Sequence, residues 1–226
     1  MSETIFILPP ALAPACASAV AQTPFGAVTG SGSIFVRTEG TDARALIYAA
    51  KAGGARRVIA ADVVQPVSPL LEPGDIIIPA DVIDQTKLRP FTFFVGKGYG
   101  FIKLNPPFCP DLMHALLDAA RHRTARSFRG GTYVCADGPR TATPAELRMY
   151  RQWGADLVGT GLLPEAYLAR ELELCYGAIT AVGEADLLPI MQAAVAAPQQ
   201  RSCACDQTMK ISKEQGVVGE DWRSWL

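Results

Sequence analysis

The chain has 226 residues, of which 49% are hydrophobic and 19% charged, and its formal net charge at pH 7 is −1. A near-neutral chain without a lysine and arginine cluster lacks the usual pattern of a nucleic-acid-binding protein, and no apolar run is long enough to span a bilayer. We therefore expect a globular protein with neither nucleic acid nor membrane as partner. The apolar start is interrupted by prolines and has no basic residues, which favours the cytoplasm over a cleaved signal.

The first part of the chain reads as short apolar strands separated by turns. We expect strands at 4–8 and 58–64, a strand with an internal glycine turn over 27–37, and a helix over 41–52. The turn at 30–33 could hold phosphate through Ser31, and Arg44 is one of two basic residues nearby. The structural alternatives are a plain hairpin and a solvated arginine.

The middle of the chain begins with a turn at 73–75 and an apolar strand at 76–78. Aromatic residues then gather between 91 and 101. An amphipathic helix over 108–126 carries both histidines of the chain, His114 and His122, which we interpret as surface residues.

The stretch 130–186 alternates strands and helices. Thr143 precedes Pro144 and Glu146, the pattern of a helix N-cap with a capping box, and Gly154 is placed to end that helix. Apolar strands at 132–136, 156–158 and 175–182 surround this helix and a second one that begins at 164–165. The alternation predicts an α/β layered domain.

Several motifs of this stretch resemble those of the purine nucleoside phosphorylase superfamily, in its methylthioadenosine phosphorylase branch. They are Gly138-Pro139-Arg140, Ala145-Glu146, Trp153-Gly154-Ala155-Asp156, Pro164-Glu165, Leu168-Ala169 and Cys175-Tyr176, with PGDIIIPADVIDQTKLRPFTFF (73–94) upstream. The resemblance covers roughly residues 47–205. It implies a three-layer fold with a central mixed β-sheet flanked by helices, one domain over 1–205, a C-terminal tail over 206–226, and a homotrimer.

The resemblance also implies an activity, the cleavage of the N-glycosidic bond of a purine nucleoside or a 5′-modified, methylthioadenosine-like nucleoside. Phosphate is the co-substrate in the family, and no cofactor is expected. Such an enzyme must hold the leaving base and place a nucleophile on the far face of the sugar. The matching positions are Glu184 and Asp186 for the base, Thr160 beneath the ribose, Thr141 beside the base, Arg140 and Glu146 supporting the base pocket, and Phe101 reaching a neighbouring subunit.

Two loops depart from the family pattern where phosphate should bind. The first reads LPPALAPA (8–15), and proline has no N–H to donate to an anion. The second contains Asp62, whose negative charge would repel phosphate. Hydrolysis, with water activated by Asp62 or Glu184, is therefore an alternative to phosphorolysis. A non-catalytic nucleoside-binding or assembly homologue, or an enzyme repurposed to an unusual base–sugar conjugate, is a further alternative.

The chain has six cysteines. We interpret Cys16, Cys109, Cys135 and Cys175 as buried small hydrophobes and the CxC pair, Cys203 and Cys205, as exposed in a polar tail. The pair resembles one that can form a disulfide in thermophilic members, although reduced thiols are usual in the cytoplasm. A zinc site at this pair would need two further ligands, and since the chain has only two histidines, His114 and His122, no metal is expected. We expect the two tryptophans near the C-terminus, Trp222 and Trp225, to pack on the body of the protein or on a neighbouring subunit.

Overall fold

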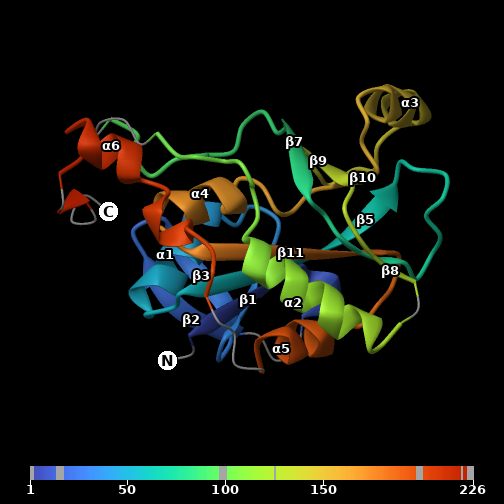
Figure 1. Cartoon of the computed structure of the whole chain (residues 1–226), viewed down its shortest axis with the longest axis horizontal. Helices are drawn as coiled ribbons and strands as arrows, with labels where there is room; N and C mark the ends of the chain where they lie inside the picture. The colour runs from blue at the N-terminus through green and yellow to red at the C-terminus, as the bar shows by residue number, and fades with distance from the viewer. Residues whose placement is uncertain are drawn as a thin grey trace.

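The computed structural model describes residues 3–13, 18–96, 101–124, 126–196, 201–219 and 221–222 (Figure 1). The strands are β1 (Thr4–Leu8), β2 (Ser18–Thr23), β3 (Gly26–Ser31), β4 (Ile34–Val36), β5 (Arg57–Pro66), β6 (Ile76–Ile78), β7 (Asp81–Gln85), β8 (Ser127–Arg129), β9 (Thr132–Ala136), β10 (Leu157–Gly159) and β11 (Cys175–Val182). The helices are α1 (Ala43–Ala52), α2 (Pro110–Arg121), α3 (Pro144–Gln152), α4 (Glu165–Glu171), α5 (Leu188–Ala196) and α6 (Lys210–Glu214), with 3-10 turns at Pro10–Leu12 and Cys205–Gln207.

Strand β5 is the centre of the sheet. It lies parallel to β1 on one side and to β11 on the other, and its last residues pair antiparallel with β10. Strands β10, β9 and β7 continue in parallel, whereas β2, β3 and β4 form an antiparallel edge. The sheet is therefore mixed, as expected.

Helices cover both faces of this sheet (Figure 1). α2 and α5 pack on each other, and α2 contacts β11, β6 and β8 while α5 contacts β1. α1 and α4 pack together, with α1 against β2 and β3 and α4 against β11. The three-layer fold predicted from the sequence is confirmed, and its apolar core runs along β1, β5 and β11.

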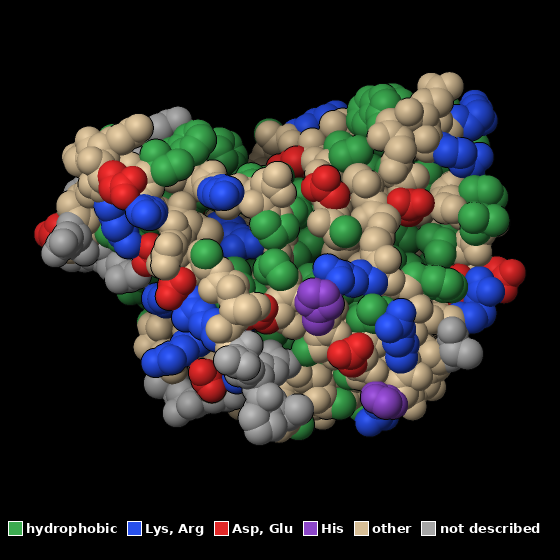
Figure 2. All heavy atoms as spheres, viewed as in Figure 1, with side chains coloured by type: hydrophobic (Ala, Val, Ile, Leu, Met, Phe, Trp, Pro, Cys, Tyr) green, Lys and Arg blue, Asp and Glu red, His purple; other side chains and the backbone are tan. Residues whose placement is uncertain are grey.

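Local sequence signals predicted most of the helices and strands correctly. β9 and β11 have the expected bounds, and Thr143 caps α3 through a capping box with Glu146. The expected strand over 27–37 is a hairpin, β3 and β4, joined at Gly32-Ser33. The helix expected over 108–126 is shorter, since α2 begins at Pro110 after its N-cap Cys109 and ends before His122. Both histidines are exposed, as expected (Figure 2).

The C-terminal segment is not a free tail. Trp222 is fully buried, with its ring 5.7 Å from that of Phe94, so the expected docking is confirmed for this tryptophan. The expectation of an exposed CxC pair is wrong, since Cys205 is 1% exposed and Cys203 is partly buried. Cys16 and Trp225 lie outside the described residues. Of the helices described, none is long and apolar enough to cross a membrane.

Candidate active site

A cavity of about 710 Å³ opens where several strands end. Its wall includes Pro9 and Pro10 after β1, residues 37–43 after β4, Asp62 of β5, residues 137–139 after β9 and Thr160 after β10. Residues 88–90 also contribute to the wall. The carboxyl ends of parallel strands are the usual place for a ligand in an α/β sheet. Both loops that depart from the family pattern therefore face the cavity.

Asp62 lies at the bottom of this cavity and is 4% exposed. Its Oδ2 accepts hydrogen bonds from the Tyr133 hydroxyl at 2.5 Å and from the backbone N–H groups of Gly161 and Thr160 at 3.1 and 3.2 Å. Its Oδ1 lies 3.9 Å from Nη1 of Arg37. Backbone N–H groups beside an arginine form a typical anion-binding arrangement. In this chain, the carboxylate of Asp62 takes that place.

The guanidinium of Arg37 is held by a second buried carboxylate. Nε and Nη2 donate to Glu165 at 2.5 and 2.9 Å, and Nη1 donates to the carbonyl of Ala61 at 3.2 Å. The Tyr176 hydroxyl also donates to Glu165, at 2.8 Å. Arg37, Asp62, Glu165 and the two tyrosines form what we term the cleft network.

The charges of the cleft network do not cancel. Burial opposes the charge on Arg37, but the carboxylates of Glu165 and then Asp62 outweigh it and raise the arginine's pKa. Burial, with Asp62 near Tyr133 and Glu165 near Tyr176, raises the pKa of both phenols well above 10 and keeps them neutral. The formal charges of Arg37, Asp62 and Glu165 sum to −1.

Two glycines of β10 and its following turn are required by the cleft network. A Cβ atom on Gly159 would collide with Oδ2 of Asp62 and the Tyr133 hydroxyl. A Cβ atom on Gly161 would collide with Nη1 of Arg37. The short side chains in this turn and the large charged side chains around it are therefore matched to each other.

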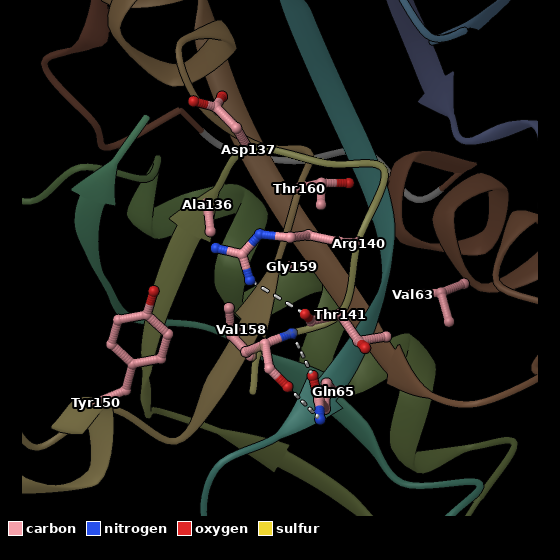
Figure 3. Close-up of a pocket in the computed structure, with 11 residues that line it drawn as sticks. Val63, Gln65, Ala136, Asp137, Arg140, Thr141, Tyr150, Val158, Gly159 and Thr160 are labelled. Atoms are coloured by element: carbon pink, nitrogen blue, oxygen red, sulfur yellow. Dashed lines mark hydrogen bonds between the residues drawn. The ribbon is translucent and has the colours of Figure 1, made fainter. Parts of the chain in front are cut away.

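A smaller cavity of about 100 Å³ adjoins the first and shares Asp137 and Thr160 with it (Figure 3). Its walls come from β5, β10 and the loop between β9 and α3. The Gln65 side chain accepts from the backbone N–H of Ala142 at 3.0 Å and donates to its carbonyl at 3.5 Å, which fixes this loop. The smaller cavity thereby brings together three residues predicted to bind substrate, Thr160, Thr141 and Arg140.

Arg140 and Glu146 form a bidentate ion pair, with N···O distances of 2.8 and 2.7 Å. Glu146 also accepts from the backbone N–H of Thr143 in the capping box. The hydrogen bonds from Arg140 and then Thr143 lower the pKa of Glu146 to about 2. The pair anchors the start of α3 beside the smaller cavity, a supporting position for both residues.

The structure leaves other predicted site residues outside the two cavities. Arg44 pairs with Asp42 at 2.7 Å and lies over the ring of Phe25, and Ser31 is part of the β3–β4 ladder. Neither lines the two cavities, and their binding of phosphate stays a prediction. Glu184 and Asp186 are exposed after β11 and line neither cavity.

Phe101 is 46% exposed, and its backbone N–H donates to Oγ of Ser212 at 2.8 Å. Its place at a neighbouring subunit's pocket stays a prediction. It lies in neither cavity of this chain.

Sequence reasoning missed four members of the cleft network: Arg37, Tyr133, Glu165 and Tyr176. It also missed Arg89, which donates to the carbonyls of Thr160 and Leu163 at 2.6 and 2.8 Å and pairs with Asp137 at 2.9 Å. For Arg37, Tyr133 and Tyr176 the available signal was a polar side chain beside or within an apolar strand, since such a group must find partners when buried.

The fold and cleft define an α/β protein of the nucleoside phosphorylase type, and comparisons with known proteins agree. The sequence model of the Phosphorylase superfamily matches residues 17–204. A probable 6-oxopurine nucleoside phosphorylase from Moorella thermoacetica is 38% identical over an alignment of 188 positions, which covers 72% of this chain and 72% of that one. The S-methyl-5'-thioadenosine phosphorylase of Pyrococcus furiosus is 42% identical over 144 residues, 64% of this chain and 56% of that one.

A solved structure shares the fold over nearly its whole length. The methylthioadenosine phosphorylase from an antarctic soil metagenomic library covers 100% of this chain and 97% of its own, with a TM-score of 0.77 and 24% identity. The chain belongs to the phosphorylase superfamily, in the branch of purine nucleoside phosphorylases similar to methylthioadenosine phosphorylases.

Proposed function

We propose that this chain is an enzyme that cleaves the N-glycosidic bond of a purine nucleoside or of its 5′-methylthio analogue. The observation that carries the proposal is the pair of adjoining cavities at the carboxyl edge of the sheet, which meet at Asp137 and Thr160. The base would lie in the smaller cavity, beside Thr141, and the sugar over Thr160. The names of the relatives, which are nucleoside phosphorylases, support the same bond.

The charge of the larger cavity suits this chemistry. Its lining contains the arginines Arg37 and Arg89 and the carboxylates Glu39, Asp42, Asp62, Asp137 and Glu165. Cleavage of the glycosidic bond develops positive charge on the sugar, and fixed negative charge nearby stabilises that transition state. Two charges about 4 Å apart interact by about 4 kcal/mol at the effective dielectric of a partly buried site.

Phosphate is the first candidate for the group that accepts the sugar, because the relatives are phosphorylases. Water is the second candidate, and a specific observation favours it. The N–H groups of Thr160 and Gly161 and the guanidinium of Arg37 already hold Asp62 and Glu165. A phosphate would have to displace a carboxylate within a negatively charged network. We therefore favour hydrolysis, with Asp62 as the candidate general base for the attacking water.

The test is purine release from adenosine, inosine and methylthioadenosine, with and without phosphate, with the sugar product identified as free sugar or sugar 1-phosphate. Asp62→Asn keeps the shape of the side chain and removes its charge. We expect it to lower the rate by a factor on the order of 10². Asp118→Asn, at an exposed position on α2, is the matched control and should leave the rate unchanged. No release from any of the nucleosides would contradict the proposal.

We also propose that the chain forms a homotrimer. The segment 88–101 carries exposed apolar side chains, which lie at Leu88 (93%), Phe91 (65%), Val95 (66%) and Phe101 (46%). Apolar surface of this kind is typical of a protein–protein interface. Light scattering should give three times the mass of the chain, and Phe91→Asp should reduce it. A monomeric wild-type protein would contradict the assembly but not the activity.

A further inference from the structure

Four cysteines from distant parts of the chain converge on one point. Cys109 precedes α2, Cys175 is the first residue of β11, and Cys203 and Cys205 lie in the segment after α5. Their sulfur atoms all lie within 4.8 Å of one another, and Cys175 and Cys203 are 3.6 Å apart. Three of the four are buried and Cys203 is partly buried.

This geometry matches a single metal ion. Zinc bound by four thiolates has Zn–S distances of about 2.3 Å in a tetrahedron, which places the sulfur atoms roughly 3.8 Å apart. A multi-iron cluster would hold four thiolates farther apart. Disulfides would bring bonded sulfur atoms to about 2.05 Å, whereas these cysteines are free thiols, with Cys175 and Cys203 3.6 Å apart and all four sulfur atoms mutual neighbours.

The surroundings fit a thiolate site. Nη1 of Arg170, a residue that is 3% exposed, donates to the sulfur of Cys205 at 3.0 Å and offsets negative charge there. Asp111 accepts from the Ser202 N–H at 2.8 Å and from the Cys203 N–H at 3.0 Å, which orders the CxC turn. Such outer groups orient metal ligands and tune their charge.

We propose that Cys109, Cys175, Cys203 and Cys205 bind one structural Zn²⁺ ion. Each thiol loses its proton to solvent and forms one S–Zn bond, so binding is favoured as pH rises. Four protein ligands leave no open position for substrate, which makes the site structural and not catalytic. The ion would fasten the segment that carries Cys203 and Cys205 to the start of α2 and the start of β11.

The first test needs no variant. Wild-type protein is purified under reducing conditions and analysed by elemental mass spectrometry, and the apoprotein is then titrated with Co²⁺. We expect one zinc per chain, and a Co²⁺ spectrum with sulfur-to-metal charge transfer and tetrahedral d–d bands. Reduced protein with all four thiols alkylated readily and no Zn²⁺ or Co²⁺ bound would overturn the proposal. Disulfides among these cysteines, found by mass spectrometry of protein purified without reductant, would also overturn it.

Variants locate the ion. The double variant Cys203→Ser, Cys205→Ser should lose the zinc and the charge-transfer band. Cys135→Ser is the matched control, because Cys135 is also buried but donates to the carbonyl of Gly161 at 2.9 Å, away from the cluster. It should keep one zinc per chain. Zinc retained by the double variant would overturn the assignment, whatever the chain does to nucleosides.

Discussion

The cleft network and the four-cysteine cluster both gather buried polar side chains, but they differ in how these are satisfied. In the cleft network, Arg37 is placed between two carboxylates that also accept hydrogen bonds from tyrosines and backbone N–H groups. In the cysteine cluster four like donor atoms meet around one point. In the cleft network the charged side chains already pair with each other, which disfavours the binding of an external anion. The four sulfur atoms of the cysteine cluster instead favour the binding of an external cation.

Helix α4 connects the two regions. Its first residue, Glu165, pairs with Arg37 in the cleft, and Arg170 near its end contacts Cys205. Both side chains are almost fully buried. We therefore expect that a substitution at one end of this two-turn helix also affects the buried contacts at its other end.

The largest effect is expected from Arg37→Met, which tests whether the cleft network is internally complete. It leaves the carboxylates of Asp62 and Glu165 buried without their cation, so the free energy of unfolding should fall by about 3–5 kcal/mol. Denaturant unfolding measures this. Arg44→Met removes a partly exposed pair with Asp42, whose two side chains are 21% and 20% exposed, and should lower the free energy of unfolding by about 1 kcal/mol or less. Equal losses in the two variants would show that Arg37 in the cleft network contributes no more to stability than Arg44 does in its pair with Asp42.

A pH effect is expected from Glu171, the last residue of α4. Burial raises its pKa to about 7, and hydrogen bonds from Thr92 and Phe93 only partly oppose this. Because this pKa lies above the unfolded value of 4.5, the protonated carboxyl of Glu171 contributes its full stabilisation below pH 4.5. This contribution is lost as the pH rises through 7. The loss is about 3 kcal/mol. Glu171→Gln should remove it, as measured by the difference in unfolding free energy between variant and wild type across this range. A constant difference would refute the assignment.

Gly161→Ala tests the match between the glycine turn and the charges around it. The added methyl group would collide with Nη1 of Arg37, so we expect a loss of about 1–3 kcal/mol in unfolding free energy. Gly138→Ala is the control, since its nearest neighbour is a side-chain methyl of Thr160 at 3.3 Å, which can move. Thermal unfolding of the two variants should therefore differ, and a more stable Gly161→Ala would contradict the packing described.

The smallest effect is expected from Thr143→Ala at the start of α3, a region built from local signals alone. It removes the hydrogen bond to the Glu146 N–H and should cost about 1 kcal/mol in unfolding free energy. Thr143→Ser keeps the bond and serves as control. A loss as large as that from Arg37→Met would mean that α3 is coupled to the cleft network.

Most of the fold could be predicted from the sequence because its signals are local. The capping box of α3 and the apolar run of β11 lie within a few neighbouring residues. The motifs of 130–186 also identified the family. Asp62 was predicted from its place in an altered loop, and the structure brings it to the bottom of the cleft with Thr160 beside it.

The partners of these residues could not be predicted, because they are set by contacts across the sheet. Arg37 and Glu165 are separated by 128 positions in the chain and meet only because β4 ends, and α4 begins, at the same edge of the sheet. For the same reason the sequence did not indicate which two residues could bind zinc together with Cys203 and Cys205. Cys109 and Cys175 were correctly expected to be buried, but nothing local indicates that they face Cys203 and Cys205.

The phosphate dependence of purine release, measured for wild type and for Asp62→Thr, tests whether Asp62 occupies the anion position of the cleft. We expect release from the wild type at a rate that phosphate does not change, with free sugar as the second product. Asp62→Thr, which empties the position of its carboxylate, should become dependent on phosphate by roughly tenfold or more, equivalent to about 1.4 kcal/mol. Wild-type release that requires phosphate and yields a sugar 1-phosphate would contradict the account.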